Sequence, residues 1–300
     1  MMQILLLGLG KMGLPLALNM RDQGFSVRAY DPSANQRQHA SVENISVAES
    51  LQSLFEEKGG KRIIWMMVPA GPAVDQILEE VLPQLDKGDI LIDGGNSFYR
   101  DSQRRAALCA EKEVDYLDCG SSGGTSGARN GFCAMIGGNP KAFAEVEPIF
   151  QKITLPGGYL YCGPSGSGHF TKMVHNGIEY GMMQSIAEGF THLRASGMDL
   201  DLPAIAQLYN TGSVVRGWLM ELTQKALAED PGLESIRGVA HASGEAEWMV
   251  LDAMERKVSV PSVALSLMMR FQSQDPDNYP AKVVAALRNQ FGGHAVEKKS

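Results

Sequence analysis

A short apolar run followed at once by three spaced glycines most constrains how this chain can fold. Ile4–Leu7 has the composition of a buried strand, and Gly8, Gly10 and Gly13 separate it from a helical pattern over residues 14–23. Glycines at this spacing allow a tight turn, close approach of backbone to a ligand and close packing of helix on strand. The free N–H groups at the start of such a helix favour an anion. The sequence therefore predicts a strand–turn–helix unit that binds a phosphate group.

Alternating strand-like and helix-like segments continue through the first half of the chain. This alternation indicates βαβ units and a mainly parallel sheet. The further strands are expected at residues 26–30, 63–68, 90–92, 114–117 and 132–136. The helices between them are expected at residues 14–23, 74–85, 102–113 and 140–149.

The strand signal almost vanishes after Cys162, and long amphipathic stretches follow. Helices are expected there at residues 168–196, 202–209, 244–257, 263–271 and 281–290. The predicted fold class is α/β: a Rossmann-type doubly wound sheet over residues 1–163, followed by an all-α domain over residues 164–300.

An aspartate at the end of the second expected strand bears on the choice of ligand. Asp31 stands 18 positions past Gly13, near the ~20-residue offset of the acid that binds a ribose in dinucleotide sites. Its carboxylate would accept hydrogen bonds from a 2'-hydroxyl and repel a 2'-phosphate, which favours NAD over NADP. Arg28 and Arg37 lie near enough in sequence to leave NADP open.

Composition excludes several other classes of protein. The 34 acidic and 27 basic residues give a net charge of -7 with no basic run, which argues against a nucleic-acid partner. No segment has the ~20 apolar residues that span a bilayer, and the amino-terminal run lacks a basic leader, so we expect a soluble cytoplasmic protein. The cysteines lack CxxC spacing, so neither disulfides nor a metal site is expected, and the thiols should be reduced and mostly buried: Cys109, Cys119, Cys133 and Cys162.

Four polar residues share one face of the expected helix over residues 168–196. Lys172, His175, Asn176 and Glu179 fall within about 100° of arc, and Tyr180 extends this face by one step. A solvated polar face or a Lys172–Glu179 ion pair would explain the pattern equally simply. The apolar flanks of the segment favour a cleft-lining face instead, because pockets gather convergent polar groups.

Two of these residues suit proton transfer during the oxidation of an alcohol. The reaction needs a base for the hydroxyl proton while hydride leaves for a nicotinamide. A lysine beside a cationic ring in a desolvated site can have its pKa lowered toward neutrality. A carboxylate on the same face, Glu179, offers a second proton-transfer group, which suggests more than simple oxidation.

Three loops that follow expected strands supply further candidates. They read MVPAG at residues 67–71, DGGNS at residues 93–97 and CGSSGGTSGA at residues 119–128. In an open α/β sheet the ligand lies beyond the carboxyl ends of the strands, where such loops sit. Each is equally readable as an ordinary turn, above all the serine- and glycine-rich third loop.

The motifs together resemble the decarboxylating 6-phosphogluconate dehydrogenase family, within the β-hydroxyacid dehydrogenase superfamily. The similarity runs through GLGKMG, MVPAG, DGGNS, SSGG, KMVHNGIEYG and the terminal RNQFGGH. The chain, at 300 residues, is similar in length to members of the shorter, usually NAD-linked bacterial branch of the family. The resemblance implies oxidation and decarboxylation of 6-phospho-D-gluconate to ribulose 5-phosphate and carbon dioxide.

The resemblance also implies roles for particular residues. Lys172 would be the base at the 3-hydroxyl, and Glu179 would later protonate the enediol carbon. The substrate-binding residues would be Asn96, Ser122, Gly123, Gly124, His175, Asn176, Tyr180, Arg270, Arg288 and His294. The cofactor-binding residues would be Gly8, Leu9, Gly10, Lys11, Met12, Gly13, Asp31, Val68, Pro69, Ala70 and Asn96. No metal is implied, and Arg288 and His294 would reach the site of a neighbouring subunit, so a homo-oligomer, a dimer or tetramer, is expected.

One segment departs from the family pattern. Where relatives usually carry a basic residue and a threonine around a tryptophan, this chain reads SGEAEWM over residues 243–249. Glu247 beside a phosphate dianion would weaken binding unless its side chain points elsewhere. Two alternatives therefore stay open: an enzyme for a smaller or unphosphorylated β-hydroxyacid, and a catalytically silent NAD-binding regulatory protein, which would be expected to have lost Lys172 or Glu179.

Overall fold

The computed structural model describes residues 3–56, 60–292 and 295–297. The chain divides into two compact units, Met1–His175 and Asn176–Ser300, and the division falls within the long helix α8 (Ser167–Arg194). The first two turns of α8 count with the first unit because they pack on its sheet, as described below.

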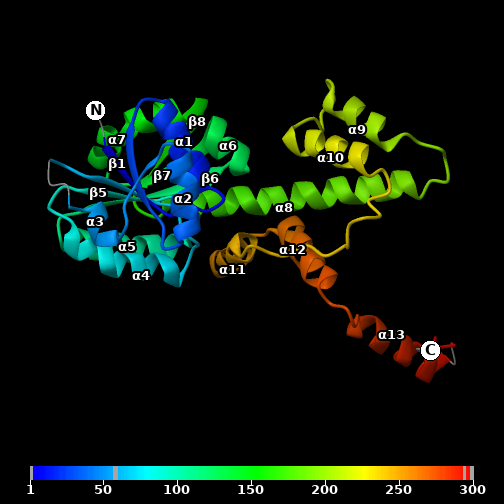
Figure 1. The fold of residues 1–300 in the computed structure, drawn as a ribbon. Coiled ribbons are helices and arrows are strands. Elements are labelled where there is room, and N and C mark those ends of the chain that lie inside the picture. Colours follow the sequence, from blue (N-terminus) through cyan, green and yellow to red (C-terminus); the bar gives the residue numbers. More distant parts are fainter. Residues whose placement is uncertain (1–2, 57–59, 293–294, 298–300) are drawn as a thin grey trace. The chain divides into compact units, whose positions relative to one another are not determined.

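An eight-stranded sheet forms the centre of the first unit (Figure 1). Its order is β3-β2-β1-β4-β5-β6-β7-β8, and all neighbouring strands are parallel except β6 and β7. The strands are β1 (Gln3–Leu7), β2 (Ser26–Tyr30), β3 (Ser46–Val47), β4 (Ile63–Met66), β5 (Ile90–Asp93), β6 (Asp115–Ser122), β7 (Phe132–Gly138) and β8 (Thr154–Gly163). The order reverses at β1, so the turn after β1 lies at the switch point of the sheet, where such sheets bind ligands.

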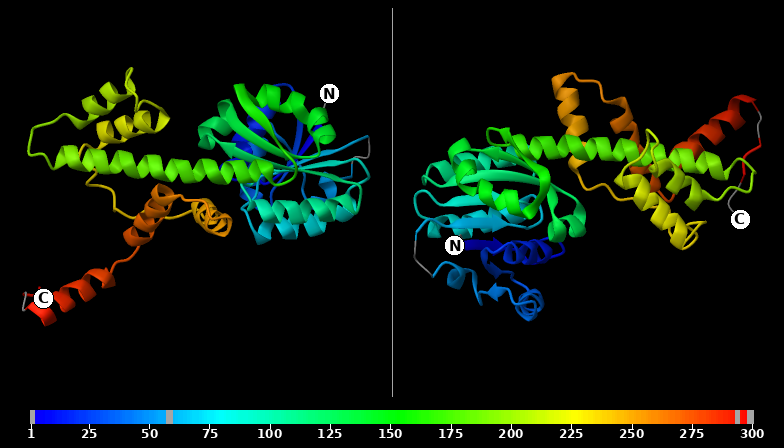
Figure 2. Two further views of the ribbon diagram at one scale, coloured as in Figure 1. Left: turned by 180° about the vertical axis from the view of Figure 1, so that it is seen from behind. Right: turned by 90° about the horizontal axis from the view of Figure 1, so that it is seen from above.

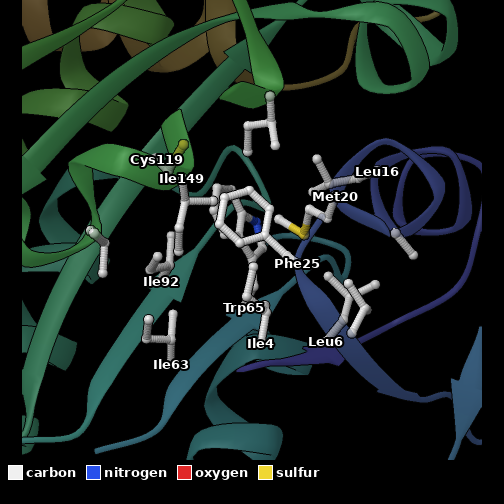
Figure 3. Packing of buried hydrophobic residues seen from close by; sticks show 14 of the residues in the cluster. Ile4, Leu6, Leu16, Met20, Phe25, Ile63, Trp65, Ile92, Cys119 and Ile149 are labelled. Atoms are coloured by element: carbon white, nitrogen blue, oxygen red, sulfur yellow. The ribbon is translucent and has the colours of Figure 1, made fainter. Parts of the chain in front are cut away.

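Side chains of the inner strands are buried on both faces of the sheet. Along β1, Ile4 and Leu6 belong to one apolar cluster, while Leu5 and Leu7 belong to another. The first cluster reaches helices α1 (Gly13–Asp22) and α7 (Pro140–Ile153), and Figure 3 shows Trp65 among the labelled side chains of this cluster. Continuous apolar runs of this kind are typical of parallel strands covered on both faces.

Helices cover the two faces of this sheet, as the views from behind and above also show (Figure 2). Residues of α1, α6 and α7 enter the first cluster, and residues of α3, α4 and α5 enter the second. The helices of this unit before α8 are α1 (Gly13–Asp22), α2 (Ala34–Val42), α3 (Leu51–Leu54), α4 (Pro72–Val81), the 3-10 turn η1 (Leu82–Gln84), α5 (Tyr99–Ala110), α6 (Gly124–Asn130) and α7 (Pro140–Ile153).

A buried asparagine ties three of these helices together. Asn19 of α1 is 3% exposed, and its Nδ2 donates to the carbonyl oxygens of Ala128 at 3.1 Å and Ile153 at 3.0 Å. These carbonyls lie in the last turns of α6 and α7, where backbone acceptors lack partners within the helix. The side chain thus satisfies two helix ends inside an apolar layer.

The second unit is helical. Beyond the rest of α8 it contains α9 (Leu202–Asn210), α10 (Trp218–Glu229), α11 (Glu245–Arg256), α12 (Pro261–Ser273) and α13 (Tyr279–Gly292). Helix α9 packs beside α10, and α11 beside α12. Tyr180, Ala246 and Leu267 form a small apolar core between α8, α11 and α12.

The α/β sheet followed by a helical region is confirmed, with differences at particular elements. The strand expected over residues 63–68 ends at Met66, and β6 extends to Ser122 because it pairs with antiparallel β7 up to that residue. Helix α10 was not expected, although its buried Met220 and Leu227 are seven residues apart on one face. The ten-residue strand β8 and the short elements α2, α3, α6 and β3 were also missed.

The cysteines agree only in part with expectation. All four are free thiols; Cys109 and Cys119 are buried, Cys162 is half-buried, and Cys133 is exposed, so the expectation of mostly buried thiols is wrong for Cys133. Alternation along β7 turns Cys133 away from the buried Phe132 and Ala134 on either side. Burial raises the pKa of the Cys109 thiol to about 12.

No helix within the described residues is long and apolar enough to cross a membrane.

Replacing Asn19 with alanine should lower the free energy of unfolding by about 2 kcal/mol, because two buried carbonyls would lose their donor. Urea titration followed by circular dichroism measures this difference. The matched control is Asn35→Ala on the exposed surface of α2, which should change stability by less than about 0.5 kcal/mol. Equal changes in the free energy of unfolding for the two substitutions would contradict a stabilising role for the Asn19 hydrogen bonds.

Candidate active site

The three glycines of the turn after β1 serve different purposes. A Cβ on Gly8 would collide with the Met67 carbonyl oxygen, and a Cβ on Gly13 would collide with the Gly8 carbonyl oxygen. These two positions need glycine because backbone packs directly on backbone. A Cβ on Gly10 would meet nothing within 4 Å, and Gly10 is exposed. Only Gly10 therefore presents bare backbone toward open space, where a ligand can approach it.

Asp31 fastens this turn to the end of β2. Its Oδ2 accepts from the Leu9 N–H at 2.8 Å, and its Oδ1 accepts from the Ser33 N–H at 2.8 Å. Each carboxylate oxygen keeps a further lone pair for a ribose hydroxyl. The Arg37 guanidinium lies 5.8 Å from the Tyr30 ring centroid and donates to the Asp31 carbonyl oxygen at 2.8 Å. Arg37 is thus engaged with the backbone of this segment.

The loops after β4, β5 and β6 contact one another. A Cβ on Gly95 would lie 2.5 Å from the Val68 carbonyl oxygen, so the second loop packs directly on the first. Asn96 has a left-handed backbone with φ of 52°, and its Oδ1 accepts from the Ser121 N–H at 2.9 Å. The three predicted loops therefore form one surface at the carboxyl edge of the sheet.

Lys172 lies in the second turn of α8, against the last residues of β6. It is 5% exposed, and a Cβ on Gly120 would collide with the Cβ of Lys172. Its Nζ lies 3.3 Å from His175 Nδ1, and His175 Nε2 lies 3.0 Å from Ser122 Oγ. The structure thus joins three predicted residues, Ser122, His175 and Lys172, in one hydrogen-bonded row. When Lys172 is an ammonium it donates to Nδ1, so Nε2 carries the proton and donates to the Ser122 hydroxyl.

A buried carboxylate that the sequence analysis overlooked holds the start of α8. Asp118 of β6 is fully buried; its Oδ1 accepts from the Gly166 N–H at 2.7 Å, and its Oδ2 accepts from the His169 N–H at 2.9 Å. N–H groups at the start of a helix have no acceptor within the helix, so Asp118 supplies one. The helix dipole also favours a negative charge at this end. Asp118 thereby fixes the position of the turn that precedes Lys172.

In the second unit, Tyr180 and Arg270 form a preassembled pair. The Arg270 guanidinium carbon lies 3.4 Å from the Tyr180 ring centroid, and the Tyr180 hydroxyl accepts from the Ser243 N–H at 3.0 Å. Cation–aromatic stacking of this kind orients the guanidinium and leaves donors at its edge for a ligand. Nearby on α8, Asn176 donates from Nδ2 to Glu245 Oε1 at 2.9 Å.

Glu247 and Met249, in the segment SGEAEWM that departs from the family pattern, lie in different environments. Glu247 is exposed in the first turn of α11. Met249 packs against α8, since a Cβ on Gly177 would collide with its sulfur.

The remaining predicted residues are placed as follows. Glu179 is half-buried on α8, and Arg288 is exposed on α13. Lys11 is exposed in the glycine turn, with Met12 half-buried beside it. Gly123 and Gly124 have positive φ where β6 passes into α6. His294 lies outside the described residues.

A second buried network lies beneath the loops. Asp93 is fully buried and accepts from Ser97 Oγ and Tyr116 OH, each at 2.7 Å, and Arg105 NH1 lies 3.6 Å from its Oδ2. Burial and the neighbouring Asp93 raise the pKa of Tyr116 well above its usual range. Sequence reasoning missed this network: Asp93 directly follows an apolar strand, but Arg105 lies in a polar stretch of α5 where its charge gives no sign of burial.

Among the described residues, no group of three or more His, Cys, Asp or Glu side chains is arranged to hold a metal ion. The features that fit a ligand are instead those of a dinucleotide: exposed backbone at Gly10, a carboxylate at the end of β2, and a switch point between them. The fold and this turn define a dinucleotide-binding protein, the class to which NAD- and NADP-dependent oxidoreductases belong.

Comparisons with known proteins agree with this class. Residues 3–163 match the model for the NAD binding domain of 6-phosphogluconate dehydrogenase, and residues 168–278 match that for the 6-phosphogluconate dehydrogenase C-terminal domain. The chain belongs to the 6-phosphogluconate dehydrogenase family and is an oxidoreductase.

Relatives extend over nearly all of the chain. YqeC of Bacillus subtilis is 46% identical over 298 residues, covering 99% of this chain and 100% of the relative. The NAD(+)-dependent, decarboxylating 6-phosphogluconate dehydrogenase of Haloferax volcanii is 41% identical over 300 residues, covering 99% of each. The structure of Plasmodium falciparum 6-phosphogluconate dehydrogenase, an enzyme solved in complex with its cofactor NADP+, superposes with a TM-score of 0.85 at 31% identity, covering 99% of this chain and 67% of that one.

The different environments of Gly10 and Gly13 predict different consequences of adding a methyl group. Gly10→Ala should leave thermal stability nearly unchanged and weaken dinucleotide binding about tenfold or more, because the methyl fills the approach to the backbone. Gly13→Ala should instead lower the thermal midpoint, because its Cβ would overlap the Gly8 carbonyl. Thermal unfolding and calorimetric titration with NAD separate the two effects. Undiminished NAD binding by Gly10→Ala would remove this turn from the cofactor site.

Proposed function

We propose that the protein catalyses the oxidative decarboxylation of 6-phospho-D-gluconate to D-ribulose 5-phosphate and carbon dioxide, with NAD as the oxidant. The observation that carries the proposal is the row Ser122–His175–Lys172 at the carboxyl end of β6. It offers an amine for a hydroxyl proton next to neutral donors for a carboxylate. Membership of the family and the decarboxylating relatives named above support the same reaction.

In the first step Lys172 accepts the proton of the substrate's 3-hydroxyl while the hydride on that carbon leaves. NAD, when bound, supplies the hydride acceptor. The lysine is held by packing on Gly120 and by the contact with His175, so its amine has little freedom to turn away. Preorganisation of this kind lowers the entropic cost of reaching the reactive geometry.

In the second step the 3-keto acid loses its carboxyl group as carbon dioxide. The electron pair of the broken C–C bond forms a C2–C3 double bond while the C3 oxygen takes the proton back from Lys172, which gives an enediol. We assign Glu179 as the acid that delivers a proton to the carbon that carried the carboxyl group, which gives the ketopentose phosphate. Asn96, Ser122, Gly123, Gly124, His175 and Asn176 would hold the carboxylate and hydroxyls.

We assign the phosphate to Tyr180 and Arg270, with Arg288 and His294 contributed by a neighbouring subunit of a homo-oligomer. The stacked Tyr180–Arg270 pair supports this assignment, because its guanidinium is oriented before any ligand arrives. We also propose that residues 1–163 bind the cofactor and that residues 164–300 bind the substrate and form the contacts of the oligomer. We propose a cytoplasmic location for the protein.

Glu247 supports one second candidate, a dehydrogenase for an unphosphorylated β-hydroxyacid. Its negative charge stands where relatives usually carry a cation. Its exposure favours the phosphorylated substrate nonetheless, since an exposed carboxylate in water repels a dianion only weakly. Purified protein offered 6-phosphogluconate or gluconate, each with NAD or NADP, tests both candidates. NADH with carbon dioxide from 6-phosphogluconate supports the first, and turnover of gluconate alone supports the second.

Lys172→Ala should lower the rate of NADH formation by about 10²–10⁴-fold, because the hydroxyl proton would lose its acceptor. NAD affinity should persist, since the cofactor turn is untouched. The control is Lys141→Ala on the exposed surface of α7, which should retain full activity. Substantial activity in Lys172→Ala would contradict the base assignment.

Asp31→Ala should weaken NAD binding more than NADP binding. Loss of the bonds to Leu9 and Ser33 loosens the turn for both cofactors, but only NAD loses the acceptor for its 2'-hydroxyl. The NAD to NADP ratio of dissociation constants measures the effect. An unchanged ratio would remove Asp31 from cofactor selection.

A further inference from the structure

A single buried arginine connects the loops at the carboxyl edge of the sheet. Arg105 of α5 is fully buried. Its Nε and NH2 donate to the two carboxylate oxygens of Asp75 at 2.8 and 3.1 Å, and NH2 also donates to the Gly71 carbonyl oxygen at 3.0 Å. Its NH1 lies 3.6 Å from Asp93 Oδ2. The guanidinium thus reaches the end of the loop after β4, the first turn of α4 and the end of β5.

Each of these contacts fixes one end of a loop. Gly71 closes the loop of Val68–Ala70 and has a left-handed φ of 92°, so its carbonyl has a direction that other residues rarely adopt. Asp93 opens the loop that carries Asn96 and binds it internally through Ser97 Oγ at 2.7 Å and the Gly95 N–H at 3.0 Å. With Gly95 packed on the Val68 carbonyl, the two loops form one body.

The place of the loops after β4 and β5 in the strand order indicates which half of a bound dinucleotide they would face. The strand order runs β2-β1-β4-β5, with the ribose-binding acid Asp31 after β2 and the glycine turn after β1. In a doubly wound sheet the two mononucleotide halves lie on either side of the pyrophosphate turn. The loops after β4 and β5 therefore lie on the side opposite the adenosine ribose, which is the nicotinamide side.

We propose that Arg105 is a positioning residue for the nicotinamide half of the NAD site: its guanidinium holds the loops after β4 and β5 in one fixed arrangement. Arg105 touches neither cofactor nor substrate and acts through Val68–Ala70 and Asn96. The proposal rests on the NAD site proposed above and adds a residue to it.

The neighbouring Arg104 provides a matched control. It donates to the same Asp75 carboxylate at 2.9 Å and to Asp101 at 3.4 Å, but its side chain is 48% exposed. Either substitution, of Arg104 or of Arg105, therefore removes one ion pair with Asp75. Only the loss of Arg105 also removes the hydrogen bond to Gly71 and the charged contact with Asp93.

The test compares the binding of NAD with that of ADP-ribose, which lacks the nicotinamide ring. In calorimetric titrations Arg105→Met should bind NAD about tenfold or more weakly than the wild type, because small displacements of positioning groups are costly, with ADP-ribose affinity changed less than about twofold. Arg104→Met should leave both affinities within about twofold of the wild type. Circular dichroism establishes that each variant is folded.

Other outcomes would overturn the proposal. They are an unchanged NAD affinity in Arg105→Met, equal weakening of NAD and ADP-ribose, or the same loss in Arg104→Met. If Arg105→Met does not fold, Arg105→Lys gives the same comparison, because lysine keeps the charge but cannot reproduce the planar fork. The titrations measure cofactor binding without any sugar acid. Their result therefore tests the role of Arg105 even if the protein does not catalyse the proposed reaction. A wild-type chain that binds neither NAD nor ADP-ribose would instead overturn the cofactor site itself.

Discussion

The carboxylate of Asp118 determines where the longest helix of the protein begins. It lies inside the sheet, accepts the N–H groups of Gly166 and His169, and places a negative charge at the positive end of the α8 dipole. A charge this deeply buried is tolerated only with such partners. Because the helix start is fixed from within the sheet, Lys172 and His175 one and two turns later are fixed with it.

The edge of the sheet is organised by backbone contacts as much as by side chains. Gly8 packs on Met67, Gly13 on Gly8, and Gly95 on Val68. Arg105 and Asn96 then bind neighbouring loops through hydrogen bonds. A surface built in this way is nearly rigid before a ligand arrives, so little conformational entropy remains to be lost on binding.

The sequence predicted the parts of the structure that repeat or match a spacing. The strand alternation, the glycine turn and the polar face of α8 could be recognised from residue types alone. The Asp118 cap and the Arg105 network could not, because their partners lie about 50 and 30 positions away and depend on which strands become neighbours. Helix α10 was missed although its segment WLMELTQKALAE is rich in apolar residues, of which Met220 and Leu227 are buried. The roles proposed for Asn176 and Glu179 come from the family resemblance and not from their spacing.

Matched spacing between α8 and β6 explains how a helix can deliver residues to the edge of a sheet. Gly168 packs on the Asp118 carbonyl, Lys172 on Gly120, and His175 hydrogen-bonds Ser122, so each step of two residues in the strand meets three or four in the helix. Two strand residues advance about 6.6 Å, and one helical turn advances about 5.4 Å. The two lengths differ by only about 1 Å per step, which side chains can span over two steps, but the mismatch would grow over many more. Inserting one residue into this stretch of α8 would rotate everything after it by about 100°, which gives this short segment far less tolerance to insertion than any surface loop.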